Sequence, residues 1–197
     1  MTEPQHRPSF ADRFVGLAHS RWLLPALLIV ETLETSILPL PYEAAFIALC
    51  LAARDRIWAI VAVSVLGSTI GGSIVYVIGA QYFDAVVTQV GAQEVAQTYL
   101  DRFSDRGASF IFLGGTTPAP SYLINLVAGA TGYPYWEFLG VFSFSRLVRF
   151  AILGGLLFLF GTQITGAWAR LPKGVKRAFT ILLIAAIAYW FVSGLSE

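Results

Sequence analysis

Long apolar runs separated by short polar stretches make up most of this chain. Residues 57–83 and 136–161 each exceed the roughly 20 apolar residues that a transmembrane helix needs. A third apolar run, residues 178–194, follows a basic stretch and predicts a final transmembrane helix. The pattern therefore predicts an all-α integral membrane protein.

Two further apolar runs, residues 22–53 and 108–132, are broken in the middle by prolines. Proline removes a backbone donor and clashes with the preceding helical turn, so a helix should end at each break. A leg of about 12 residues reaches only about 18 Å, short of a hydrocarbon core of roughly 30 Å. Each run therefore predicts a re-entrant hairpin that enters and leaves on the same side. The predicted breaks are Pro39 and Pro41 in the first hairpin and Pro118 and Pro120 in the second.

Three polar segments complete the layout. Residues 10–21 mix arginines with apolar side chains, which predicts an interfacial amphipathic helix, with a disordered arm as the alternative. Residues 84–107 carry charges of both signs and predict an extramembrane or surface segment. Residues 162–177 hold four basic residues and no acid, which predicts a cytoplasmic loop by the positive-inside rule. Counting back places the N-terminus and the first hairpin on the cytoplasmic side and the second hairpin on the other side.

The two broken runs match one another. Pro39-x-Pro41 recurs as Pro118-x-Pro120, and each pair precedes a leg rich in small residues, a short turn, an aromatic residue and a full span. Because the units enter from opposite sides, they predict an inverted repeat, as in several secondary transporters. The predicted fold is an inverted repeat of two re-entrant helical hairpins, each followed by a transmembrane helix. An N-terminal interfacial helix and a C-terminal transmembrane helix complete this single membrane domain, residues 1–197.

Glycines recur along the predicted span at residues 57–83. Small residues at intervals of three to five let helix backbones approach closely in lipid, so we interpret them as packing positions. They are Gly67, Gly71, Gly72 and Gly79.

The composition is typical of a membrane protein and argues against several kinds of ligand. The chain is 56% hydrophobic and 13% charged, with a mean hydropathy of +0.69, whereas soluble domains carry roughly 25% charge. A net charge of +1 argues against a nucleic-acid partner. Cys50 is the only cysteine, and His6 and His19 both precede the first apolar run. We therefore expect no metal and no cofactor.

Three glutamates and two arginines lie well inside the predicted membrane segments, where a charge is destabilising and marks function by default. Glu31, Glu34 and Glu43 flank the first break. Arg146 and Arg149, three residues apart, share one face of the span at residues 136–161. In a structural interpretation, ion pairs between Glu34 or Glu43 and an arginine hold the repeats together. In a functional one, the five side chains line a polar cavity between the hairpins.

The functional interpretation divides the chemistry between acids and bases. Neighbouring carboxylates do not all ionise readily, so Glu34, Glu43 and Glu31 are candidates for proton exchange. Arg146 and Arg149 suit a phosphate, which a guanidinium binds as a planar fork. Backbone amides at the half-helix after the second break can add a positive dipole end. Neutral hydrogen-bonding candidates for the same substrate site are Thr116, Thr117, Ser121 and Asn125.

A family resemblance is carried by four segments: ETSILPLPYEAAF, LGSTIGGSIVYVIG, TPAPSYLINLVAG and SRLVRF. Together they resemble the DedA/VTT (SNARE-associated) membrane protein family and, within it, the short YqaA-like branch. The resemblance implies a bacterial inner-membrane lipid transporter with paired re-entrant hairpins. Members are associated with moving phospholipids or undecaprenyl phosphate between leaflets, with proton and membrane-potential coupling implicated. The second hairpin departs from better-studied members, since Tyr122 stands where a basic residue is expected.

Three hypotheses follow. The first is a lipid translocase, a flippase or scramblase, for an anionic phosphate-bearing lipid, with protons as the coupling partner. The second is a non-transporting scaffold or envelope-homeostasis protein whose buried ion pairs are structural. The third, a membrane enzyme, is the weakest, since no P-loop or carboxylate cluster with metal spacing is present. The lipid's identity, the direction of transport and the oligomeric state, a homo-oligomer included, stay open.

Overall fold

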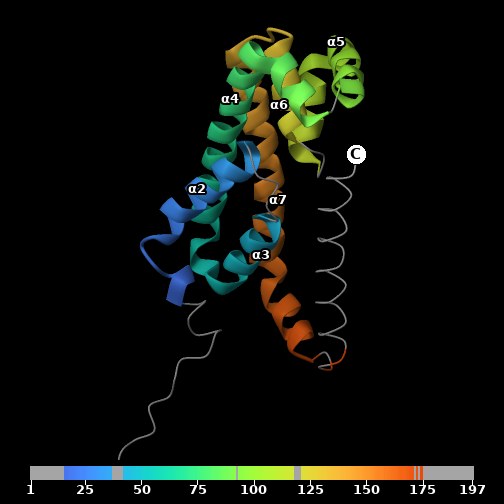
Figure 1. The fold of residues 1–197 in the computed structure, drawn as a ribbon. Helices are drawn as coiled ribbons and strands as arrows, with labels where there is room; N and C mark the ends of the chain where they lie inside the picture. The colour runs from blue at the N-terminus through green and yellow to red at the C-terminus, as the bar shows by residue number, and fades with distance from the viewer. Residues whose placement is uncertain are drawn as a thin grey trace, which may run out of the picture.

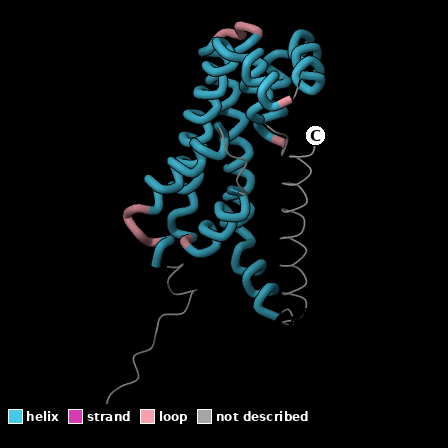
Figure 2. The backbone as a smooth tube through the Cα atoms, viewed as in Figure 1, coloured by secondary structure: helices cyan, strands magenta, loops and turns pink. Residues whose placement is uncertain are grey.

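The computed structural model describes residues 16–36, 42–91, 93–117 and 121–170, with Pro172 and Gly174. Throughout these residues the regular secondary structure is helical, without strands (Figures 1 and 2). The four proline breaks, the predicted C-terminal span at residues 178–194 and most of the predicted interfacial helix lie outside them. The elements are α2 (Leu23–Ser36), α3 (Tyr42–Ala52), the 3-10 turn η1 (Arg54–Arg56), α4 (Ile57–Val90), α5 (Gln93–Thr116), α6 (Ser121–Ala130) and α7 (Tyr135–Arg170).

Two helices, α4 and α7, are long and apolar enough to cross a membrane. They correspond to the predicted spans at residues 57–83 and 136–161. α7 begins after Pro134, whose carbonyl accepts the first helical hydrogen bond, from the amide of Phe138 at 3.0 Å. It continues to Arg170, so residues 162–170, predicted as the start of a loop, are helical. No proline or cap stops the helix at Gly161, which explains the extension.

The polar stretch at residues 84–107 is also helical, as the end of α4 and the first part of α5. α4 bends at Tyr82, where φ is −133°, and α5 bends at Gly107. Between them α4 ends at Gly91, whose φ of +70° is a left-handed conformation that favours glycine. This segment is therefore two helical arms rather than an irregular loop.

The short helices form two pairs at different heights along α4 and α7. In Figure 1, α2 and α3 lie beside the lower half of the long helices, and α5 and α6 lie beside their upper half. The first helix of each pair packs on the long helix that follows it in the sequence: α2 on α4, and α5 on α7. The second helix packs on the other long helix, α3 on α7 and α6 on α4. Each pair therefore joins the two halves of the chain.

Close helix contacts occur at the glycines of α4. A methyl group at Gly67 would lie 2.8 Å from Cβ of Glu31 on α2, and one at Gly71 would lie 2.6 Å from the Thr32 carbonyl oxygen. Further along, a side chain at Gly79 would overlap the carbonyl of Leu126 on α6. These contacts confirm the predicted packing role, because any larger residue would push the helices apart.

The surface of α4 and α7 away from the short helices is apolar. Exposed large side chains there include Trp58, Leu66, Ile70 and Leu159. By contrast, residues Leu123 to Gly129 of α6 are buried without interruption. An apolar exterior around a buried, short central helix fits a protein surrounded by hydrocarbon rather than water.

Candidate functional site

The candidate site is built around two arginines of α7, Arg146 and Arg149. Arg146 is only 5% exposed, although it lies in the middle of a long apolar helix. Its guanidinium carbon lies 5.0 Å from the ring centroid of Phe142, which is one turn earlier on the same helix. A cation over an aromatic face is stabilised by the ring quadrupole, more so when both are desolvated. Phe142 therefore holds one side of the guanidinium.

Arg146 also contacts the second pair of short helices. Its Nη2 donates to Oγ of Ser121, the first residue of α6, at 2.5 Å. Its Nε is buried and has no hydrogen-bond partner among the residues that the structure describes. The N-terminus of a helix carries partial positive charge and free amides, so a guanidinium beside it creates a locally positive region. Such a region attracts an anion.

Arg149 joins the two helix pairs. Its Nη2 forms an ion pair with Glu43, the second residue of α3. Its Nη1 donates to the carbonyl of Thr117, directly after α5, at 2.5 Å. The end of a helix carries partial negative charge, so the Thr117 carbonyl is a favourable acceptor for a cation. The structural interpretation of the sequence named an ion pair between Glu34 or Glu43 and an arginine, and the Glu43–Arg149 ion pair is one of these.

The other two acids lie on α2. Glu31 is 1% exposed, and within the described part of the chain its Oε2 has no hydrogen-bond partner. Glu34, half-buried, accepts a hydrogen bond from Thr35 at 3.3 Å. Neither is in direct ion-pair contact with an arginine among the described residues, yet the charges of Arg146 and Arg149 act electrostatically on both. Glu31 is more buried than Glu34, because it faces Gly67 of α4.

The neutral candidates divide into two kinds. The hydroxyls of Thr116 and Thr117 donate to carbonyls of their own helix, Phe112 and Leu113, so their protons are already used. Asn125 of α6 is 0% exposed, and neither its side-chain oxygen nor its side-chain nitrogen has a hydrogen-bond partner in the described ranges. A buried amide without partners is costly, so its retention in a wholly buried helix marks it as a site where a ligand or water can bind.

The sequence analysis did not identify two residues of the site, Phe142 and Thr35. Phe142 could have been identified from the sequence, because it lies one turn before Arg146 on the same face. Thr35, which is buried next to Glu34, could not, since a threonine in a membrane helix is common. For metals, no group of three or more His, Cys, Asp and Glu side chains is placed to hold an ion in the part of the chain that the structure describes.

The geometry brings the ends of three short helices to one place on α7. Arg149 contacts residues at the start of α3 and the end of α5, and Arg146 contacts the start of α6. Glu31 and Glu34 of α2 are within electrostatic reach of both arginines. A partly buried cluster of charges where short helices meet is the kind of site that membrane transport proteins use for ions and anionic groups.

This arrangement defines a helical membrane protein with a buried charged site between two helix pairs. Comparison with known families is decisive on its membership: the VTT domain model matches residues 40–159. The chain belongs to the VTT-domain family, the DedA family of membrane proteins, which is generally linked to membrane transport or lipid-related function. Its assignment to the YqaA-like branch stays a prediction.

One curated relative spans nearly the whole chain. It is an uncharacterized protein of Haemophilus influenzae, 23% identical over 185 residues, which cover 92% of this chain and 95% of the relative. No solved structure matches the chain.

Proposed function

We propose that this protein is a lipid translocase that moves an anionic, phosphate-bearing lipid between the leaflets of the bacterial inner membrane. The observation that carries the proposal is the convergence of three short-helix ends, those of α3, α5 and α6, on the buried Arg146 and the half-buried Arg149. Irregular backbone at membrane depth is stable only where protein covers it or where it lines a cavity. A fold that gathers three such ends around two cations suits the passage of an anion.

The two helix pairs act as re-entrant hairpins of an inverted repeat. Support comes from their lengths, since α3 (Tyr42–Ala52) and α6 (Ser121–Ala130) are too short to cross a bilayer. Further support comes from the exchanged packing of α3 on α7 and of α6 on α4. In Figure 1, the end of α3 and the C-terminal end of α7 lie at the same end of the bundle as the N-terminal side of α2. Arginines follow α3 in η1 (Arg54–Arg56) and end α7 at Arg170, so this is the cytoplasmic end by the positive-inside rule.

In this function the arginines bind the phosphate and the acids exchange the proton. Arg146 has an unpartnered Nε beside the α6 N-terminus, and Ser121 and Asn125 supply neutral hydrogen bonds there. An incoming phosphate competes with Glu43 for Arg149, and the released carboxylate takes up a proton. Glu31 and Glu34, under the charge of the same arginines, respond to the same event. Binding of the anion and protonation of the acids are thereby coupled.

The experiment is leaflet exchange in proteoliposomes. Purified protein is reconstituted with a fluorescent phosphatidic acid, a fluorescent polyprenyl phosphate or a fluorescent neutral glycolipid, with and without a proton gradient. Outer-leaflet label is then quenched chemically. We expect protein-dependent exchange of at least one phosphate lipid and none of the glycolipid, with a rate that responds to the gradient. Equal rates with and without protein for every phosphate lipid would reject the function.

A second candidate, a membrane scaffold with structural ion pairs, is favoured by the Glu43–Arg149 ion pair. The candidates differ in what happens when both partners are neutralised together. Replacing both charges of an ion pair leaves no unpaired charge, so the fold should survive. A scaffold with Glu43→Gln and Arg149→Gln keeps its function, whereas a translocase with the same changes keeps its fold and loses exchange.

A further inference from the structure

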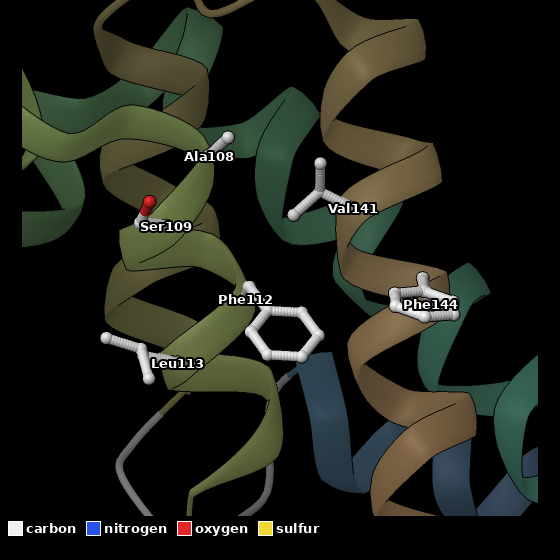
Figure 3. Close-up of a pocket in the computed structure, with 6 residues that line it drawn as sticks. All are labelled: Ala108, Ser109, Phe112, Leu113, Val141 and Phe144. Carbon is white, nitrogen blue, oxygen red and sulfur yellow. The ribbon is translucent and has the colours of Figure 1, made fainter.

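An apolar hollow lies between α5 and α7, just after the Gly107 bend of α5. Its volume is about 450 Å³, within the range of roughly 300–1,000 Å³ of ligand pockets. Figure 3 shows the ring of Phe112 in the space between the two helices, with Val141 and Phe144 on the α7 side. The Phe112 and Phe144 rings stack with centroids 6.0 Å apart. The lining residues are Ala108, Ser109, Phe112, Leu113, Val141 and Phe144.

The hollow opens sideways from the helix bundle. Leu113 is 52% exposed and Phe144 is 58% exposed, although both are large and apolar. Ser109 is the sole polar side chain in the lining. In a membrane protein an apolar opening on the side of the bundle faces hydrocarbon chains, so the hollow can be entered from the bilayer.

One end of the hollow is next to the charged site. α5 and α7 meet where a side chain at Gly115 would overlap the Ser145 hydroxyl, and the hollow lies on the Phe112 side of that crossing. Thr117 follows Leu113 by one helical turn, about 5.4 Å, and its carbonyl accepts the hydrogen bond from Arg149. An apolar surface and the half-buried guanidinium of Arg149 are therefore neighbours along the same edge of α5.

We propose that the α5–α7 hollow binds one hydrocarbon chain of the lipid whose phosphate binds Arg146 and Arg149. The proposal rests on the proposed function and adds where the substrate's chain lies. An amphiphile with an anionic head and an apolar chain matches both ends of this surface. The apolar segment at residues 178–194 of the same chain matches only the apolar end of this surface, because it has no acidic residue to contact the arginines.

The hollow positions the chain rather than drawing it out of the membrane. A hydrocarbon chain in a bilayer is already in an apolar medium, so transfer into the hollow releases little hydrophobic free energy. The hollow instead determines the orientation of the lipid. When the hydrocarbon chain lies along α5, the phosphate lies one turn away, at Arg149. This is the advantage of orientation, which raises the frequency of productive binding without tighter binding of every lipid.

Photo-crosslinking in proteoliposomes tests the location. The probes are a phosphatidic acid with a diazirine in one acyl chain and a neutral glycolipid with the same diazirine-bearing chain. We expect the phosphatidic acid to label the α5 and α7 lining peptides in excess over the exposed α4 face at Leu66 and Ile70, and the glycolipid to label both surfaces alike. Equal labelling of both surfaces by the phosphatidic acid overturns the proposal. A photo-reactive residue in place of Ser109 that links to residues 178–194 also overturns it, because that segment then fills the hollow.

A matched pair of variants separates this proposal from the proposed function. Ser109→Trp fills the hollow, and Leu66→Trp places the same ring on the exposed face of α4, where the wild-type residue is 57% exposed. We expect Ser109→Trp to slow phosphatidic acid exchange by about fivefold or more. Leu66→Trp should leave it unchanged, and both proteins should unfold at the wild-type temperature. Wild-type exchange by a folded Ser109→Trp protein overturns the hollow alone, whereas absence of exchange by the wild-type protein overturns the function.

Discussion

Replacing Arg146 by glutamine perturbs the most deeply buried cation of the site. Arg146 is 5% exposed, and its charge acts on Glu31 and Glu34. When all are ionised, the site holds the carboxylates of Glu31, Glu34 and Glu43 and the guanidiniums of Arg146 and Arg149, so the variant leaves three negative charges facing one positive charge. Removing one partner from buried, mutually compensating charges destabilises a protein by about 3–5 kcal/mol.

The expected shift can be measured directly. In a chain of this size about 1 kcal/mol lowers the unfolding temperature by roughly 2–4 °C, so Arg146→Gln should unfold about 6–20 °C below wild type. The assay is thermal unfolding of the purified protein in detergent, followed by loss of the monodisperse peak. Arg102→Gln is the matched control, because Arg102 is exposed on α5 and its loss should change stability by no more than about 0.5 kcal/mol.

Glu31→Gln tests the same charge balance in the opposite direction, because it removes a negative charge from the site. Glu31 is 1% exposed, and its neutralisation leaves two negative and two positive charges in the site. The variant should therefore unfold at or above the wild-type temperature. The reasoning is refuted if Glu31→Gln loses as much stability as Arg146→Gln, or if Arg146→Gln unfolds with the Arg102→Gln control.

Three further outcomes are expected. Gly79→Ala should destabilise by about 1–3 kcal/mol in thermal unfolding, because the new methyl overlaps the Leu126 carbonyl, whereas Gly140→Ala, with open space around it, should be neutral or stabilising. Ser121→Ala should cost about 1.5–3 kcal/mol in the same assay, the range for a hydrogen bond to a charged group, and an unshifted midpoint would count against the Arg146 contact. Arg149→Lys should keep the fold but slow phosphate-lipid exchange in proteoliposomes, since an ammonium lacks the planar fork; wild-type exchange would exclude bidentate recognition.

The sequence was informative about elements that depend on the local pattern. The spans became α4 and α7 because long apolar runs without proline form continuous helices, and the glycines of α4 pack as the spacing predicted. The bend at Tyr82 was not predictable, since tyrosine has no intrinsic tendency to bend a helix. The end of α7 at Arg170 was missed because the basic loop was inferred from charge, which sets orientation but does not stop a helix.

The sequence singled out the charged residues of the predicted membrane segments as candidates, but not their pairing. Buried charges in apolar helices are rare enough to identify Glu31, Glu34, Glu43, Arg146 and Arg149 from the sequence. Their partners depend on how α2 and α6 pack on α4 and how α3 packs on α7, which spacing along one helix does not determine. The Glu43–Arg149 ion pair is one of those that the structural interpretation of the sequence allowed, since it named Glu34 or Glu43 as the acid. The contact between Ser121 and Arg146 was not predicted.

In the proposed function, Arg149 and Glu43 serve lipid transport rather than holding the fold together. The most direct measurement is phosphatidic acid exchange in proteoliposomes by the paired variant Glu43→Gln with Arg149→Gln, alongside wild type at equal protein content. Because the pair is neutralised together, we predict a folded, monodisperse protein whose exchange falls to the rate of protein-free liposomes. Exchange at the wild-type rate by that folded variant would contradict the account.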